Sequence, residues 1–217
     1  MILARIICFL IGYCFGIILV GYLLGKMFNV DIRKQGSGNV GTTNTMRVLG
    51  FKMGLITLLF DVSKGWMAAG MAWFDYHVMF PNDIRLLMVY AAFGAVIGHD
   101  FPIYMGFKGG KGVATGIAFF SVVAPMGVPL AVAVFIVTVL ATRYVSLASI
   151  LGTLVCMLEL LLFASKDWLP YRRGQIVEVV ILTCIVSVIV MIKHRSNIKR
   201  LIAGQENVFS FHKSQKS

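Results

Sequence analysis

The chain has 217 residues, of which 59% are hydrophobic and 13% are charged, and its mean hydropathy is +0.86. A soluble domain of this length cannot hide so much apolar material, so the composition predicts an all-α integral membrane protein, a single domain over residues 1–217. The net charge of +11 is typical of membrane-protein loops that face the cytoplasm and anionic lipid, and we expect no nucleic-acid partner.

Apolar stretches predict membrane helices over 2–24, 53–74, 85–98, 147–164 and 176–192. The first contains two small-x-x-x-small pairs, Gly12/Gly16 and Gly21/Gly25, which predict that this helix packs closely against its neighbours. A polar segment over 25–52 follows it, and a basic tail begins at about residue 193. The cysteines lie inside apolar runs without metal-ligand spacing, so no metal or cofactor site is expected.

The region 116–142 allows two interpretations, a single crossing or a hairpin broken near Pro125, Gly127 and Pro129. The hairpin places 14 Lys and Arg residues on one side of the membrane and five on the other. The positive-inside rule therefore favours the hairpin. It predicts a compact bundle of about seven membrane segments, two of them short, with the N-terminus outside and the C-terminus in the cytoplasm.

A glycine–lysine loop, Phe107 to Gly112, is the first candidate site. Glycines allow backbone N–H groups to approach an anion, Lys108 and Lys111 add positive charge, and a following helix would point its positive N-terminus at the same place. The alternative is a glycine-rich turn with basic residues at the membrane surface. The two interpretations are equally supported by the loop alone.

A second candidate is the polar segment from Gly36 to Arg47, where glycines alternate with serine, asparagine and threonine. Such a segment can present many donors to an oxyanion, and an arginine can bind phosphate through two hydrogen bonds. A flexible polar loop is the alternative, but the density of polar side chains beside an apolar bundle favours binding.

Charged residues inside predicted membrane helices are costly and are usually paired or functional. Asp61 and Lys64 are three residues apart, which fits either a neutralised structural pair or a substrate site. Glu159 stands alone in an apolar helix, and nothing near it in the sequence indicates its partner. His99 fits either a base beside Asp100 or a residue that braces the loop.

Two further groups fall on the same predicted face. Arg143, Ser146 and Ser149 follow the hairpin, with the two serines on one helix face, although such serines often bond only their own backbone. The tail offers His194, Asn197 and Glu206, for which a basic juxtamembrane anchor is the alternative.

These motifs together resemble the bacterial membrane acyl-phosphate:glycerol-3-phosphate acyltransferases. The family motif G-S-G-N-x-G-A-T-N-x-x-R is similar to Gly36–Arg47, with Thr42 in place of alanine. The motif G-H-x-x-P followed by F-K-G-G-K-G-V-A-T is matched from Gly98 to Thr115. The elements D-x-x-K-G, R-Y-x-S-x-x-S and a histidine–asparagine pair followed by G-x-E are also present, so the resemblance covers nearly the whole chain.

The resemblance implies transfer of a fatty acyl group from acyl-phosphate to the 1-hydroxyl of glycerol 3-phosphate, with lysophosphatidic acid and phosphate as products and no cofactor. It implies a multi-pass protein of the bacterial inner membrane, with the bilayer as its partner and the active site facing the cytoplasm, and we expect a monomer. The implied catalytic residues are Ser37, Arg47, Lys108, Lys111, His194 and Asn197. The implied substrate-binding residues are Gly36, Gly38, Asn39, Gly41, Asn44, Asp61, Lys64, His99, Gly109, Gly110, Gly112, Thr115, Arg143, Ser146, Ser149 and Glu206.

The residues themselves show no nucleophile–base pair, so we expect no acyl-enzyme. His194, His99 and a substrate phosphate are the candidate proton acceptors; the resemblance implies the phosphate, and we expect that no protein base is required. A phosphate-binding membrane transporter or lipid flippase is the alternative from another class. Transport sites lie near the membrane midplane, however, whereas the polar motifs here gather on one predicted face.

Overall fold

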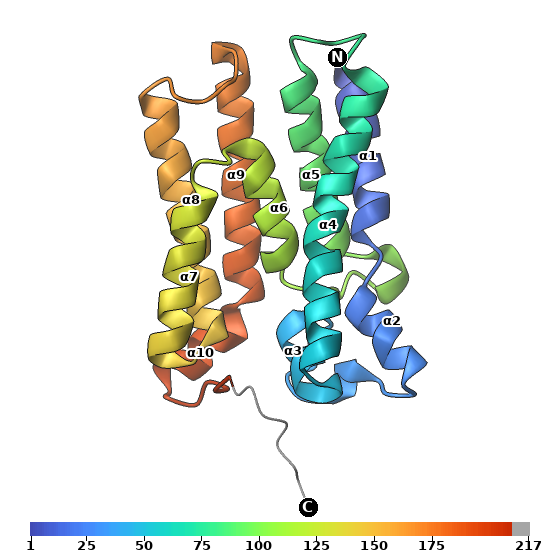
Figure 1. Ribbon diagram of the computed structural model, residues 1–217, viewed down its shortest axis with the longest axis vertical. Helices are drawn as coiled ribbons and strands as arrows, with labels where there is room; N and C mark the ends of the chain where they lie inside the picture. The colour runs from blue at the N-terminus through green and yellow to red at the C-terminus, as the bar shows by residue number, and fades with distance from the viewer. Residues whose placement is uncertain (210–217) are drawn as a thin grey trace, which may run out of the picture.

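The computed structural model describes residues 1–209, and every regular element in that range is helical. Figure 1 shows an elongated bundle whose long helices run along its axis, with the N-terminus at the upper end and α3 and α10 at the lower end. The helices are α1 (Ile2–Gly16), α2 (Val20–Met27), α3 (Thr42–Leu49), α4 (Phe51–Tyr76), α5 (Ile84–Asp100), α6 (Val113–Val123), α7 (Val128–Thr142), α8 (Val145–Ser165), α9 (Arg173–Lys193) and α10 (Arg195–Ile202). Short 3-10 turns lie at Ile32–Lys34 (η1) and Ile103–Met105 (η2). Lys213 and Lys216, counted in the basic tail, lie outside the described residues.

By length and composition, four helical stretches within 1–209 are suited to cross a membrane. They are Ile2–Met27, Ile84–Met105, Val145–Ser165 and Arg173–Lys193. Helix α4 has 26 residues and is long enough as well, but Asp61 and Lys64 lower its mean hydropathy. The protein is therefore an all-α, multi-pass membrane protein, as its composition predicts.

Helices α1 and α5 pack closely through glycines on both sides of their contact. A Cβ atom added at Gly12 or Gly16 would collide with the backbone of Ala91 or Ala95 on α5. The first predicted glycine pair therefore packs against a neighbouring helix, as expected. The second pair also packs closely, but against the polar segment after α2 and against α3: a Cβ atom at Gly21 would collide with the Val40 carbonyl and the Thr45 hydroxyl, and one at Gly25 with the Val30 carbonyl.

The first apolar stretch is suited to cross the membrane, as predicted, but it is not one continuous helix. Helix α1 ends at Gly16 and α2 begins at Val20, which frees main-chain carbonyl groups from the helical hydrogen-bond pattern. Lys64 Nζ donates to the carbonyls of Gly16 (3.1 Å) and Ile18 (3.2 Å), and the Tyr104 hydroxyl donates to that of Ile17 (2.7 Å). Such a break is stable inside a membrane protein because side chains satisfy the freed backbone groups.

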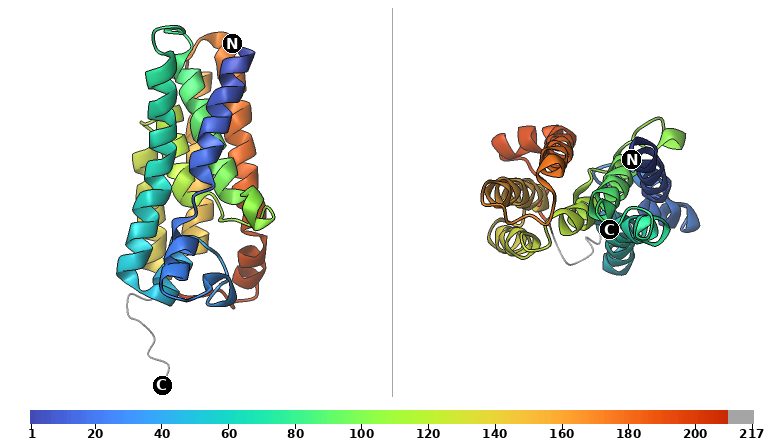
Figure 2. Two further views of the ribbon diagram at one scale, coloured as in Figure 1. Left: turned by 90° about the vertical axis from the view of Figure 1, so that its right-hand side faces the viewer. Right: turned by 90° about the horizontal axis from the view of Figure 1, so that it is seen from above.

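The region 116–142 is divided into α6 and α7, joined through residues 124–127. The two helices run in opposite directions, so the start of α6 and the end of α7 both point toward the end of the bundle that carries α3 and α10 (Figure 1). Seen from above, α6 lies between the group formed by α1, α4 and α5 and the group formed by α7, α8 and α9 (Figure 2). The chain segments that carry the polar motifs are thereby brought to the lower half of the molecule.

Candidate active site

A cavity of about 460 Å³ lies where α3 and α4 face α6, α7, α8 and α10. One part of its wall is polar and comes from the segment 37–47, Lys111, His194, Asn197 and Glu206. The other part is apolar and comes from α6, α7 and α8, with Phe120, Val128, Phe135 and Cys156 among its residues. A cavity built in this way fits a molecule with a charged headgroup and a hydrocarbon tail.

The polar end contains a chain of hydrogen bonds from the glycine–lysine loop to α10. Lys111 Nζ donates to Asn197 Oδ1 (2.6 Å), and Asn197 Nδ2 donates to Glu206 Oε1 (2.9 Å). Arg200 Nε donates to the other carboxylate oxygen of Glu206 (3.0 Å). Burial lowers the pKa of Lys111 to about 8, with nearby Arg200 and Arg47 acting in the same direction against Glu206. A bound phosphate would raise the pKa of Lys111 again, because a negative charge beside the ammonium group favours its protonated form.

His194 lies at the junction of α9 and α10, is 2% exposed and lines the cavity. Its Nδ1 donates to the carbonyl of Val190 (2.8 Å), which leaves Nε2 as the acceptor of a neutral imidazole. Burial, with Lys111 nearby, lowers the pKa of His194 to about 4, so the ring is neutral at physiological pH. It is therefore suited to accept a hydrogen bond from a substrate hydroxyl group.

The polar segment before α3 is held in shape by Asn44 rather than left free for a ligand. Asn44 Nδ2 donates to the carbonyls of Ile32, Gln35 and Asn39 at 2.8–3.1 Å, and Asn44 Oδ1 accepts from the Ser37 N–H (2.7 Å). Gly36 has φ +60° and faces Asn44 Oδ1 so closely that a Cβ atom would collide with it. Although Asn44 reaches the cavity wall, its hydrogen bonds stabilise the loop, which presents Ser37 and Asn39 to the cavity beside Arg47 of α3.

The glycine–lysine loop also differs from its expected role. The N–H groups of Gly109 and Gly110 donate to the carbonyls of Asp100 (3.2 Å) and His99 (2.9 Å) at the end of α5, so they are not available to an anion. A Cβ atom at Gly110 would collide with the imidazole of His99. These glycines are therefore required for close packing, and the loop contributes Lys111 and the start of α6, where Val113 and Ala114 line the cavity.

Helix α6 begins at Val113, directly after Gly112, which has φ +72°. The main-chain N–H groups of the first helical turn have no acceptors within the helix. This end of α6 therefore adds positive potential to the same cavity wall as Lys111.

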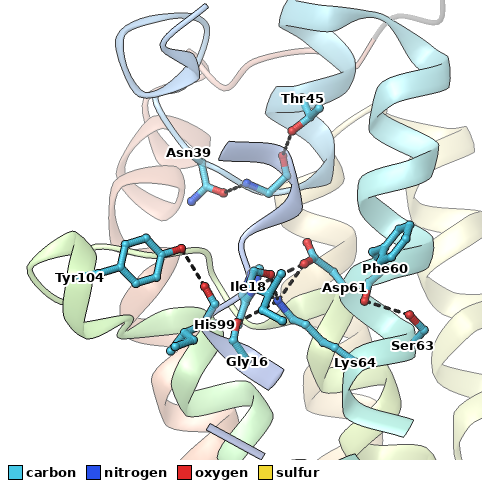
Figure 3. Close-up of polar contacts among 12 residues, drawn as sticks. Gly16, Ile18, Asn39, Thr45, Phe60, Asp61, Ser63, Lys64, His99 and Tyr104 are labelled. Carbon is cyan, nitrogen blue, oxygen red and sulfur yellow. Dashed lines mark hydrogen bonds and ion pairs between the residues drawn. The ribbon is translucent and has the colours of Figure 1, made fainter. Parts of the chain in front are cut away.

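Asp61, Lys64 and His99 form a buried cluster beside the break between α1 and α2 (Figure 3). Lys64 Nζ donates to Asp61 Oδ1 (2.9 Å) and lies 2.8 Å from His99 Nδ1, in addition to its bonds to the Gly16 and Ile18 carbonyls. Because an ammonium group only donates, His99 Nδ1 is the acceptor. We call these three residues the helix-break cluster. Its geometry supports the structural alternative for Lys64, while Asp61 and His99 also reach the cavity wall.

The structure places thirteen of the predicted site residues on the cavity wall and nine elsewhere. On the wall are Ser37, Asn39, Gly41, Asn44, Arg47, Asp61, His99, Lys111, Ser146, Ser149, His194, Asn197 and Glu206. Away from it are Gly36, Gly38, Lys64, Lys108, Gly109, Gly110, Gly112, Thr115 and Arg143. Among these, Lys108 and Arg143 have exposed side chains, whereas Thr115 is fully buried in the helix packing.

The sequence reasoning missed the apolar part of the wall. On α8 the lining residues continue from Ser146 and Ser149 to Thr153 and Cys156, one helical turn at a time. The same spacing that paired the two serines would have found Thr153 and Cys156. No comparable signal marks the α7 residues, because α7 is apolar on all sides.

Comparison with known proteins agrees with this geometry. The family model described as glycerol-3-phosphate acyltransferase matches residues 6–204. The chain belongs to the glycerol-3-phosphate acyltransferase family. It is an acyltransferase, as the sequence motifs predicted.

Two curated relatives, each named glycerol-3-phosphate acyltransferase, illustrate the extent of the match. The protein from Trichlorobacter lovleyi is 40% identical over 198 residues, covering 91% of this chain and 94% of its own. The protein from Halalkalibacterium halodurans is 40% identical over 197 residues, covering 90% and 91%.

Two crystal structures of PlsY (YgiH), described as an integral membrane glycerol 3-phosphate acyltransferase, have the same fold. The glycerol 3-phosphate form superposes with a TM-score of 0.80 and 33% identity, covering 95% of this chain and 96% of that one. The lysophosphatidic acid form gives a TM-score of 0.77 and 32% identity over the same shares.

Proposed function

We propose that the protein transfers a fatty acyl group from acyl-phosphate to the 1-hydroxyl of glycerol 3-phosphate and releases lysophosphatidic acid and phosphate. The observation that carries the proposal is one cavity with a cationic, hydrogen-bonding end and an apolar end. Both substrates are phosphates and one has a long tail, so this cavity matches the pair. The related crystal structures described with glycerol 3-phosphate and with lysophosphatidic acid support the same substrate and product.

In this proposal Arg47, Ser149, His194 and Asn197 hold glycerol 3-phosphate, and Lys111 with the start of α6 faces the acyl-phosphate. The substrate hydroxyl oxygen attacks the acyl carbonyl carbon, the bond from that carbon to the phosphate oxygen breaks, and phosphate leaves with the electron pair. Lys111 and the backbone N–H groups stabilise the charge that develops on the leaving group. Holding both substrates in one cavity removes much of the entropic cost of their encounter.

The hydroxyl proton passes to the departing phosphate. His194 Nε2 accepts a hydrogen bond from the hydroxyl and orients it, since its Nδ1 is committed to Val190. The second ionisation of a phosphate group has a pKa of about 6, so the released phosphate is a competent proton acceptor at neutral pH. A protein base is then not required.

The proposed topology has about seven membrane segments, with the N-terminus outside and the cavity mouth toward the cytoplasm of a bacterial inner membrane. The excess of basic residues in the segments 25–52 and 193–200 supports this orientation. One chain supplies the whole cavity wall, which supports a monomer as the active unit. Reporter fusions at the two ends of the chain test the orientation, and opposite locations are expected.

The activity assay uses the purified protein in lipid with palmitoyl-phosphate and labelled glycerol 3-phosphate, without coenzyme A or acyl carrier protein. Equal amounts of labelled lysophosphatidic acid and phosphate are expected. Phosphate without labelled lipid would indicate a phosphatase, and no product from folded protein would contradict the proposal. A transporter or flippase would move substrate across vesicles without forming the ester.

A further inference from the structure

A second, much smaller space around Glu159 adjoins the apolar end of the cavity. Phe120, Val128 and Cys156 line both the main cavity and this smaller one, whose volume is about 10 Å³. That volume is close to the minimum needed for one water molecule. The wall formed by α6, α7 and α8 therefore continues from the apolar end of the cavity to the carboxyl group of Glu159, and we call this stretch the passage.

Helix α8 forms one continuous wall of this passage. Ser146, Ser149, Thr153 and Cys156 line the main cavity, and Glu159 lines the small one, so each lies three or four residues after the previous one. Residues at this spacing share one face of a helix. The passage thus begins at hydroxyl groups beside the polar end and finishes at a carboxyl group.

One oxygen of the Glu159 carboxyl group lacks a hydrogen-bond partner among the described residues. This atom, Oε2, is buried. The same atom would lie 3.1 Å from a Cβ atom at Gly127, which caps the start of α7. The positive end of a helix favours a nearby negative group, so the start of α7 supplies a favourable potential for the carboxyl group at the end of the passage. Pro129 in the first turn of α7 has no N–H group that it could offer.

We propose that Glu159 is a specificity-determining residue that limits the length of the acyl chain, a role that rests on the proposed function. A longer chain would press its terminal methyl group against a polar group that is already poorly solvated, and this contact is unfavourable. Because the chain arrives from the bilayer rather than from water, added methylene groups gain little from burial. The unfavourable contact with Glu159 therefore decides which lengths of acyl chain fit.

The geometry sets the scale of the limit. Ser149 and Glu159 are ten positions apart on α8, which corresponds to about 15 Å at the rise of an α-helix. A long-chain acyl group attached to a phosphate at the polar end spans this distance. The limit consequently falls among long-chain donors rather than among short ones.

The test measures kcat/KM for lauroyl-, palmitoyl-, stearoyl- and arachidoyl-phosphate in the full-length protein in lipid. Glu159→Ala opens the end of the passage, and we expect the ratio of the longest to the shortest donor to rise about fivefold, the low end of the cost of desolvating a polar group. Glu159→Gln keeps size and polarity, so its ratio should match the wild type. Leu158→Ala is the matched control, because Leu158 is on the same helix but 60% exposed on the outer face.

An equal fall for all four donors in Glu159→Ala would show a structural role alone and overturn the inference. If that variant does not fold, Cys156→Phe replaces it, because it narrows the passage before Glu159 and should shift the preference toward lauroyl-phosphate. An unchanged profile in folded Cys156→Phe would also overturn the inference. A wild-type protein inactive with all four donors would instead contradict the proposed function.

Discussion

Two groups of buried charged side chains lie near the cavity, and they differ in how many hydrogen-bond donors remain available to a ligand. In the helix-break cluster, Lys64 bonds to Asp61, His99 and two main-chain carbonyls, so its donors are consumed by the protein. At the polar end of the cavity, Lys111 has one hydrogen-bond partner among residues 1–209, Asn197. An ammonium group has three donors, so Lys111 keeps capacity for a substrate.

The comparison shows that a buried charge in a membrane protein does not by itself mark a substrate site. Lys64 is more buried than Lys111, yet the structure shows what Lys64 does without any ligand: it satisfies carbonyls freed by the break after α1. Unused hydrogen-bonding capacity facing a cavity is the better indicator. If this is correct, changes in the helix-break cluster reduce stability, and changes at Lys111 reduce catalysis.

The largest expected effect is on stability and comes from Lys64→Met. Removing one partner of a buried ion pair leaves the other uncompensated, which costs about 3–5 kcal/mol of unfolding free energy. Two carbonyls at the helix break also lose their donor. Chemical denaturation in detergent micelles, followed by circular dichroism, measures the loss.

The double variant Asp61→Leu/Lys64→Met is the control for this prediction. It removes the isolated carboxylate, so we expect it to be more stable than Lys64→Met, although the carbonyls stay unsatisfied. Wild-type stability in Lys64→Met, combined with lost affinity for glycerol 3-phosphate, would instead place the helix-break cluster in the substrate site.

The next effect is on catalysis and compares two lysines three residues apart. Lys111→Ala removes a cation held at the cavity wall, and we expect kcat/KM to fall about 10²- to 10³-fold, as for other preorganised charge-stabilising groups. Lys108→Ala is the matched control, because Lys108 is exposed and away from the cavity; its kcat/KM should stay within about twofold of the wild type. Similar losses in both variants would contradict the assignment of Lys111.

The sequence predicts the elements of this fold well where the signal is local. The apolar stretches became α5, α8 and α9 within a few residues, and the Gly12/Gly16 pair packs against α5. The α1 break was not predictable, because the sequence around it is apolar and the stability of the break depends on Lys64, 46 residues after Ile18. Local hydropathy contains no information about such a long-range donor.

In the candidate site, too, local sequence signals predict some features and long-range contacts decide others. The motifs identified Lys111, His194 and Asn197, whose side chains meet at the cavity. They could not show that the Gly109 and Gly110 N–H groups bond to α5, or that Lys108 points away, because both depend on how the loop folds against His99 and Asp100. The spacing of glycines predicts close approach, but only the fold decides whether a ligand or another part of the chain makes that approach.

The smallest effect expected is the pH dependence that distinguishes Lys111 from a purely structural charge. Its pKa is lowered from 10.5 to about 8, so the free protein loses this cation as the pH rises through 8, and kcat/KM should fall about fivefold between pH 8 and pH 9. Lys111→Arg stays charged in this range and should lack the decline.

Stability should change in the opposite direction. Between pH 8 and 10.5 the unfolded chain binds more protons at Lys111 than the folded protein does, so the free energy of unfolding rises with pH in that window. The free-energy cost of burying the charged form of Lys111 is greatest below pH 8 and disappears toward pH 10.5. If the activity declined together with the amount of folded protein, the assignment would be contradicted. If the activity declined while the protein stayed folded, and Lys111→Arg abolished that decline, the titrating cation would lie at the phosphate end of the cavity.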